Sequence, residues 1–413
     1  MKNFKEHINE QKNTHMTHIE DKVIYGGVKG TREAIMALRD MHRMLKGEHD
    51  GSVSVKWDGA PAVFAGIDPA DGQFFVAKKG IFNKNPKIYK TAADVDADAS
   101  GDLAAKLKAA LQYLPALGIK DIVQGDFLFG PGDVKKEKIK GEEYITFHPN
   151  TIVYAVPANS RTAKEITSAK IGIVWHTTYR SSNPSDGFAS YRADYGVDVS
   201  KLKKSKAVWS QDAMLRDLTG AILSKKDSEE VSKQLSQAGK LFNQISGTTL
   251  RQLEAHDELP VLIETFGNKH VRKQQIIGDS KAHVEKLIRW IKMKYAKEIN
   301  KRKTERGKST QRAKLDTILE FFSDKNKANL IKMFDLQKVI VLAKLKLINI
   351  LERLGKLKTF VKTKDGFKTT GQEGYVAIDR LGGDAVKIVD RLEFSYNNFS
   401  PEIIKGWDKP GRS

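Results

Sequence analysis

The spacing of apolar residues divides the chain into a strand-rich part and a helix-rich part. In the first part, apolar residues at helical spacing predict helices over 31–45 and 103–114, and Thr31 is placed to cap the earlier helix. Short apolar runs bounded by Gly, Asp or Asn predict strands around these helices. These runs lie at 53–55, 63–65, 74–77, 122–125, 144–147, 152–156 and 171–175. Their order predicts a mixed α+β domain with a largely antiparallel sheet.

Helical periodicity takes over in the second part, and we predict an all-helical module over about 206–360. Three apolar stripes at helical spacing run through 284–295, 315–322 and 340–351, with Lys and Arg on the opposite faces. Strand-like runs return at 360–362, 374–378 and 385–389. These patterns predict three segments: 1–205 as the first part of the α+β domain, 206–360 as a helical insertion, and 361–413 as the second part of the domain.

The positive charge is concentrated in the helical module. The net charge of the chain is +20, and residues 201–366 hold 37 basic against 19 acidic side chains. A lysine-rich helix face is often only a solvated surface, but a surplus of this size favours a polyanionic partner, most simply nucleic acid. Few aromatic residues lie among these lysines, which favours double-stranded or structured nucleic acid over a stacked single strand.

Composition excludes several other classes of protein. The chain has 413 residues and no cysteine, which excludes disulfides, thiolate metal sites and cysteine nucleophiles. Residues 1–20 are charged and lack the apolar run of a signal peptide. The longest apolar stretch, 339–351, is interrupted by Lys344 and Lys346 and is too short to span a bilayer. We therefore expect a monomeric cytoplasmic protein with no membrane association.

Five short motifs carry the candidate chemistry. They are Lys56-Trp57-Asp58-Gly59, Gly125-Asp126-Phe127, Phe147, Glu373-Gly374 and Lys387. Each lies in or beside a predicted strand, where a polar side chain can project into a cleft. Taken singly, each has a plain structural explanation: a solvated lysine in a turn, an acid at a strand end, or an aromatic residue in a sheet core. Their order along the chain is what makes them specific.

This order resembles the covalent nucleotidyltransferase superfamily, which contains ATP-dependent DNA ligases, RNA ligases and mRNA capping enzymes. Lys56-Trp57-Asp58-Gly59 looks like its motif I, and Gly125-Asp126-Phe127 looks like motif III with Asp in place of the usual Glu. Phe147 looks like the aromatic of motif IIIa, Glu373-Gly374 like motif IV, and Lys387 like motif V. The resemblance implies a ligase-type domain that the basic helical module interrupts.

The resemblance also implies roles for individual residues. Lys56 would attack the α-phosphate of ATP, within a nucleotide pocket that includes Asp58 and Gly59. Asp126 would hold the ribose hydroxyls, and Phe147 would stack on adenine. Glu373, with Asp126, would bind Mg²⁺ or Mn²⁺.

Further basic residues would contact the phosphates. Lys387 would touch the α-phosphate, and Lys78 or Lys79 would occupy the place of a basic motif Ia residue. Motif V often reads Lys-x-Lys, whereas here Val389 takes the second position, so Arg391 is the candidate for the missing contact. An ordinary lysine is protonated at neutral pH, and nearby cations with partial burial would free the amine of Lys56 for attack.

The substrate remains open at this point. Pro61 stands where the superfamily often has Arg or Asn, and only 26 residues follow Lys387, too few for the carboxy-terminal domain usual in DNA ligases and capping enzymes. This favours an ATP-dependent polynucleotide ligase of the RNA-ligase type, which joins 5′-phosphate and 3′-hydroxyl ends. Alternatives are a capping-type guanylyltransferase that uses GTP and a non-enzymatic nucleic-acid-binding protein. The first half also resembles uncharacterised proteins of large tailed phages, which would place it in the host cytoplasm.

Overall fold

The computed structural model describes residues 18–48, 52–55, 57–83, 85–215, 223–354, 358–372, 374–378 and 385–406. They form two compact units, each assembled from separate stretches of the chain. The helical unit contains described residues within 1–53, 217–353 and 375–396. The sheet unit contains those within 54–216, 354–374 and 397–413. The α+β class with mainly antiparallel sheets is confirmed.

This division differs from the predicted one at both ends of the chain. The first helices and residues 375–396 belong to the helical unit, although the sequence pattern assigned them to the sheet domain. The reason lies in specific contacts with the helices. Glu20 forms a buried ion pair with Lys344 at 2.7 Å, and Arg391 donates a part-buried hydrogen bond to Asn268 at 2.6 Å, so both segments are tied to the helical core.

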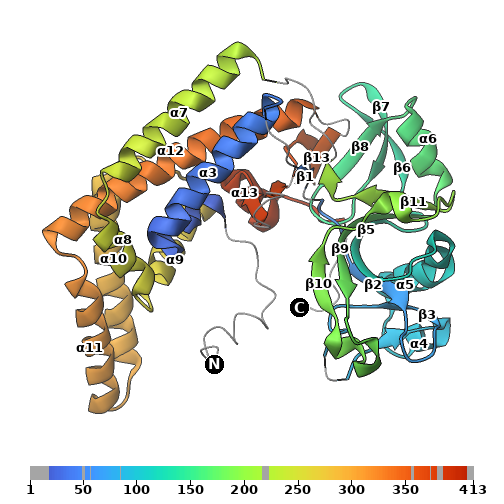
Figure 1. The fold of residues 1–413 in the computed structure, drawn as a ribbon, viewed down its shortest axis with the longest axis horizontal. Coiled ribbons are helices and arrows are strands. Elements are labelled where there is room, and N and C mark those ends of the chain that lie inside the picture. Colours follow the sequence, from blue (N-terminus) through green and yellow to red (C-terminus); the bar gives the residue numbers. More distant parts are fainter. Residues whose placement is uncertain are drawn as a thin grey trace. The chain divides into compact units, whose positions relative to one another are not determined.

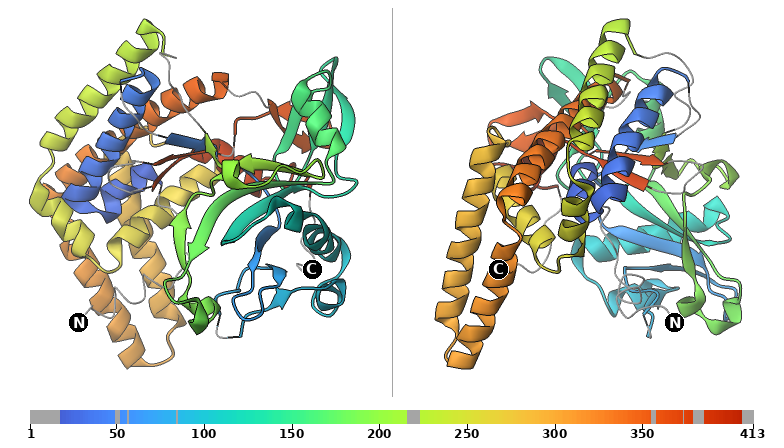
Figure 2. Two further views of the ribbon diagram at one scale, coloured as in Figure 1. Left: turned by 45° about the vertical axis from the view of Figure 1, so that its right-hand side comes forward. Right: turned by 60° about the vertical axis from the view of Figure 1, so that its left-hand side comes forward.

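The helical unit is built from long amphipathic helices that bury one face. Its helices are η1 (Ile19–Asp21), α2 (Lys22–Tyr25), α3 (Gly27–Leu45), α7 (Lys225–Asn243), α8 (Gly247–Ala255), α9 (Leu259–Arg272), α10 (Ser280–Lys301), α11 (Glu305–Glu320) and α12 (Asp324–Leu354). Figure 1 shows α3 alongside α7 and α12, and Figure 2 shows the long helices from two other sides. Leu38, Leu287 and Ile340 are fully buried in this unit. The apolar stripes read from the sequence therefore form its core.

Side-chain caps fix several of these helix starts. Ser224 accepts from the backbone N–H of Asp227 at the start of α7, and Asp279 accepts from Lys281 and Ala282 at the start of α10. The predicted cap at Thr31 is wrong, because α3 already begins at Gly27. The Thr31 hydroxyl instead donates to the carbonyl of Gly27 at 2.6 Å from inside the helix.

The sheet unit contains two sheets. The larger, seven-stranded sheet has the order β10-β9-β5-β2-β3-β4, with β11 paired in parallel to β9. The five-stranded sheet has the order β14-β13-β8-β7-β6. All other pairs within these two sheets are antiparallel. The strands are β2 (Ala62–Ile67), β3 (Phe74–Ala77), β4 (Ile88–Tyr89), β5 (Ile122–Phe129), β6 (Lys135–Ile139), β7 (Glu142–Phe147), β8 (Val153–Pro157), β9 (Ile171–Arg180), β10 (Arg192–Tyr195), β11 (Val208–Asp212), β13 (Lys358–Thr363) and β14 (Gly366–Thr369).

Short helices cover and connect these sheets. They are α4 (Ala92–Asp96), α5 (Gly101–Tyr113), η2 (Leu114–Leu117), α6 (Arg161–Ser168), η3 (Pro184–Asp186), η4 (Phe188–Ser190) and η5 (Val199–Lys201). Leu107 of α5 packs with Val63, Phe127 and Trp175 in the core of the larger sheet.

β11 lies inside the range predicted as all-helical, so that prediction is wrong for 208–212. The helices begin only at Lys225.

The remaining elements lie where the chain changes from one unit to the other. β1 (Ser52–Val55) and β12 (Met214–Leu215) are short strands at two such places. β15 (Tyr375–Ile378) and β16 (Ala385–Ile388) form an antiparallel pair in the helical unit. The last helix, α13 (Arg391–Phe399), follows β16.

Candidate nucleotide site in the sheet unit

The segment that follows Lys56 lies directly against strand β5. The backbone N–H of Ala60 donates to the carbonyl of Phe127 at 2.9 Å, and the N–H of Phe127 donates to the carbonyl of Pro61 at 3.0 Å. Gly59 is close to Asp126: a Cβ added to Gly59 would lie 2.5 Å from the Asp126 Cβ. Only glycine fits this approach. The segments that resemble motifs I and III are therefore neighbours in space.

Asp126 presents an accessible carboxylate at this junction. Its side chain is 25% exposed, and Oδ2 lies 3.6 Å from Nε2 of His176 on β9. Nδ1 of His176 is 3.0 Å from the hydroxyl of Thr177. Asp126 is thus available to accept hydrogen bonds from a ligand. Sequence reasoning did not place His176 beside it, because only the pairing of β5 with β9 brings the two residues together.

Asp58 serves a different purpose from the one predicted. Its carboxylate is buried and accepts from the backbone N–H of Ile152 at 2.7 Å and from the Asn150 side chain at 2.8 Å. The backbone N–H of Thr151 also donates to it, and the N–H of Asp58 donates to the Tyr154 hydroxyl. These bonds fasten the turn after Lys56 to the start of β8. Asp58 therefore positions this turn, and its buried carboxylate already accepts three hydrogen bonds from within the protein.

The aromatic residues near the turn form one packed cluster. Phe147 is 1% exposed, with its ring stacked on Tyr154 and tilted against Phe129. The predicted stacking of Phe147 on adenine is therefore wrong for this structure, because protein rings already cover it. Trp57 is only partly buried and packs on Tyr154 at a centroid distance of 5.0 Å and on Trp209 at 6.4 Å. Among these rings, Trp57 is the one that is not buried.

The two candidate lysines after β3 differ in their surroundings. Lys78 donates to Asp98 at 2.7 Å, and Lys87 and Tyr89 donate to the same carboxylate. Burial lowers the pKa of Lys78, but the bonds to Asp98 and Tyr89 outweigh this effect and raise it overall. Lys79 is exposed. Lys79 is therefore the better placed of the two for a phosphate, because Lys78 is already held by a carboxylate.

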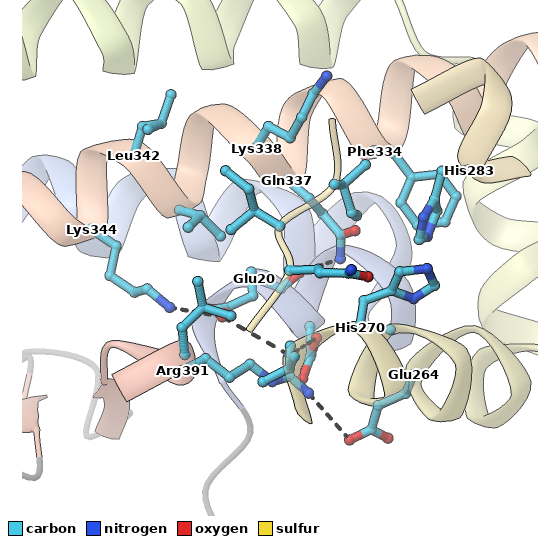
Figure 3. Close-up of a pocket in the computed structure, with 18 of the residues that line it drawn as sticks. Glu20, Glu264, His270, His283, Phe334, Gln337, Lys338, Leu342, Lys344 and Arg391 are labelled. Carbon is cyan, nitrogen blue, oxygen red and sulfur yellow. Dashed lines mark hydrogen bonds and ion pairs between the residues drawn. The ribbon is translucent and has the colours of Figure 1, made fainter. Parts of the chain in front are cut away.

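The remaining predicted residues are not brought to this site by the described structure. Lys56 and Glu373 lie outside the described residues, so their predicted roles stay predictions. Lys387 belongs to β16, and its side chain lies outside the described part of the structure, so its role also stays a prediction. Arg391 is paired within the helical unit (Figure 3), with Asp21 at 3.0 Å and with Asn268. These internal partners compete with the phosphate contact predicted for Arg391, which stays a prediction.

Among the described residues, no cluster of metal ligands is preformed. Within the ranges that the structure describes, no group of three or more His, Asp or Glu side chains is placed to bind a metal ion. Asp126 offers an accessible carboxylate at the turn, and the other predicted metal ligand, Glu373, lies outside the described residues. This suits Mg²⁺, which commonly binds through one or two carboxylates together with substrate phosphates.

Comparison with known proteins gives one match. Residues 13–403 match a family that is described as a family of unknown function (DUF6267). No curated protein matches the chain, and no solved structure matches it.

Among the helices of the described residues, none has the length and apolar character needed to cross a membrane.

Proposed function

The chain belongs to the family of unknown function DUF6267, and we propose, from its own residues, that it is an ATP-dependent polynucleotide ligase that acts through a covalent lysyl-AMP at Lys56. One observation carries the proposal. The turn that follows Lys56 is pinned to β5 by two backbone hydrogen bonds, with Gly59 against the accessible Asp126. The two segments that would hold the nucleotide therefore meet in one place.

The proposed chemistry proceeds in three steps. The Lys56 amine forms a bond to the α-phosphorus of ATP, and pyrophosphate leaves. A 5′-phosphate oxygen of the nucleic acid then attacks the same phosphorus, which breaks the P–N bond and transfers AMP. Finally, the 3′-hydroxyl of the neighbouring strand attacks the activated 5′-phosphate, and AMP leaves. A bound Mg²⁺ would offset phosphate charge in each step.

The described residues supply three supporting functions. Asp126 accepts hydrogen bonds from the ribose hydroxyls, Trp57 offers an aromatic surface for the base, and Lys79 faces the phosphates. Asp58 keeps the turn in register with β8 through its buried carboxylate. Trp57 thus takes the role that the resemblance implied for Phe147. RNA is the preferred strand in this proposal.

Helix α10 is proposed as the main grip on the nucleic acid. It carries seven basic and two acidic residues, whereas α7 of the same unit carries four and three. Lys286, Arg289, Lys292 and Lys297 of α10 are exposed. Basic side chains on a helix bind the phosphate backbone with strong salt dependence and little sequence preference.

Intact-mass measurement after incubation with ATP and Mg²⁺ tests the proposal. The wild-type protein should gain the mass of one adenylyl group (AMP less one water), and Lys56→Ala should gain none. Lys164→Ala is the matched control, because Lys164 is an exposed lysine of the same unit on α6. An unchanged wild-type mass, or an AMP adduct on Lys56→Ala, would overturn the proposal.

A non-enzymatic nucleic-acid-binding protein is the second candidate. One observation favours it: Phe147 and Arg391, two of the predicted nucleotide contacts, are already packed or paired within the protein. This candidate predicts salt-sensitive binding of nucleic acid by a protein that never acquires a covalent nucleotide. The same mass measurement separates the two.

A further inference from the structure

The last described residues of the chain lie against the segment that leads into β8. The backbone N–H of Gly406 donates to the carbonyl of Asn150 at 2.6 Å. A Cβ added to Gly406 would lie 1.8 Å from the carbonyl oxygen of His148, so only glycine fits this approach. The backbone N–H of Ile404 donates to the carbonyl of Lys362 on β13 at 2.8 Å and forms a β-bridge there. The end of the described chain is thus fastened to two neighbouring parts of the sheet unit.

One lysine of this terminal segment holds the same region through its side chain. The Lys405 ammonium donates to the hydroxyl of Thr151 at 2.7 Å and to the carbonyl of Asn397 at 2.9 Å. The Thr151 hydroxyl in turn donates to Oδ1 of Asn398 at 3.4 Å. Thr151 and Asn397 are both buried. Lys405 therefore joins the end of α13 to the segment before β8.

The backbone of Thr151 connects this contact to the turn after Lys56. The Thr151 N–H donates to the buried carboxylate of Asp58. Asp58 belongs to the turn whose Ala60 donates to β5. One residue thus contacts Lys405 through its side chain and Asp58 through its backbone. A displacement of Thr151 would therefore move the turn.

Nucleophilic attack is sensitive to small displacements of this kind. A misplacement of about 1 Å can lower the rate of a reaction about a hundredfold. A hydrogen bond from a charged donor is about twice as strong as one between neutral groups, so Lys405 is suited to hold Thr151 in place. Thr151 is 1% exposed and cannot itself touch a nucleotide. Any effect of its hydroxyl on the reaction must pass through the turn.

We propose that Lys405 is a positioning residue: it holds Thr151 and, through the Thr151 N–H and Asp58, it fixes the turn after Lys56. In this role Lys405 does not touch the nucleotide. The consequence for adenylylation rests on the proposed function. The coupling between Lys405 and the turn does not, because it is a property of the protein without nucleotide.

Hydrogen exchange of the full-length protein without nucleotide tests the coupling. In Lys405→Met, peptides that cover 57–61 and 150–153 should exchange at least about tenfold faster than in the wild type, because their hydrogen bonds open more often. Peptides of α5 should keep their wild-type rates. The control is Lys364→Met, at an exposed lysine between β13 and β14, and it should change neither region. Unchanged exchange of 57–61 in Lys405→Met overturns the proposal.

The kinetics of self-adenylylation test the consequence for the reaction. Thr151→Val removes the hydroxyl but keeps the shape and the backbone N–H, whereas Thr151→Ser keeps the hydroxyl. Lys405→Met and Thr151→Val should each lower the rate constant at saturating ATP at least about tenfold, with the KM for ATP within about threefold of the wild-type value. Thr151→Ser should stay within about threefold of the wild type in both quantities. The double variant should be no slower than the slower single variant, because both changes break one contact.

Other outcomes of the kinetics contradict the positioning role. A Thr151→Val variant as fast as the wild type, or a Lys405→Met variant that changes the KM for ATP alone, overturns it, because Lys405 would then act on the nucleotide directly. A wild-type protein that acquires no AMP overturns the ligase proposal instead. In that case the exchange measurement still decides whether Lys405 fixes the turn.

Discussion

The buried carboxylate of Asp58 accepts a 2.7 Å hydrogen bond from the backbone N–H of Ile152, which follows 94 residues later in the chain. The backbone N–H of Thr151 and the side chain of Asn150 donate to the same carboxylate. Two segments far apart in the sequence are thus joined by one acid. Because the turn after Lys56 depends on this junction, the position of the proposed nucleophile depends on Asp58 as well.

Asp58→Ala should destabilise the sheet unit strongly. It leaves two buried backbone N–H groups and one amide without an acceptor, and the expected loss in free energy of unfolding is roughly 3 kcal/mol. Urea unfolding followed by far-UV circular dichroism measures this loss. Asp186→Ala, at an exposed position, is the control and should change stability by less than about 0.5 kcal/mol. Equal stability of the two variants would show that the junction contributes little.

Asp126→Asn should impair nucleotide binding without affecting the fold. The carboxylate is partly exposed and no buried group depends on it, so Tm should stay within about 1–2 °C of the wild-type value. The loss of a charge-assisted bond to ribose should raise the KM for ATP in self-adenylylation at least about tenfold. Asp121→Asn is the control, because Asp121 is a 52% exposed acid just before the same strand. A similar KM in both variants would remove Asp126 from the site.

Much of the fold could be read from the sequence, because it depends on local patterns. The strand predicted at 74–77 is β3, and the predicted helix at 103–114 is α5 to within a few residues. The spacing of apolar residues shows which face of an element is buried. Alternate spacing indicates a strand, whereas helical spacing indicates a helix. Assignment to a unit is a long-range property. Nothing in the spacing of α3 shows that it packs on helices that follow more than 180 residues later, such as α7 through the hydrogen bond between His42 and Ser228.

The candidate site was predictable only in part, for a related reason. Motif order indicated that the Lys56 turn and Asp126 belong together, and the backbone bonds between Ala60, Pro61 and Phe127 agree with that expectation. Residue type could not show whether a side chain faces a cleft or the core. Phe147 and Asp58 both carry suitable chemistry, yet packing with Tyr154 and bonds to Ile152 direct them inward. Orientation depends on partners that the local sequence does not contain.

Neutralising α10 should weaken nucleic-acid binding more than neutralising α7. Replacing Lys286, Arg289, Lys292 and Lys297 with Gln should reduce affinity for duplex RNA or DNA. It should also make the slope of log association constant against log salt concentration shallower, by up to about 0.9 for each phosphate that the protein no longer neutralises. The control replaces four exposed lysines of α7 with Gln: Lys225, Lys226, Lys233 and Lys240. Fluorescence anisotropy over a salt series measures both effects. Equal losses from the two helices would mean that binding is diffuse over the unit.

The helical unit should lose stability on mild acidification because of His283. Burial among the rings of Phe266, His270 and Phe334 lowers its pKa to about 4, with the neighbouring His270 and Lys286 adding to the effect. In the unfolded chain its pKa returns to about 6.5, so the unfolded state binds the extra proton between these values. The stabilisation that comes from keeping His283 neutral is fully present above pH 6.5 and is lost as the pH falls toward 4. The total loss in the free energy of unfolding is up to about 3 kcal/mol. His283→Phe should make the loss of stability between pH 7.5 and 4.5 smaller than in the wild type, as measured by urea unfolding. Phe334→Leu, in the same cluster, is the control and should lower stability by a nearly constant amount at every pH. If His283→Phe keeps the wild-type dependence of stability on pH, the acid sensitivity belongs to other groups.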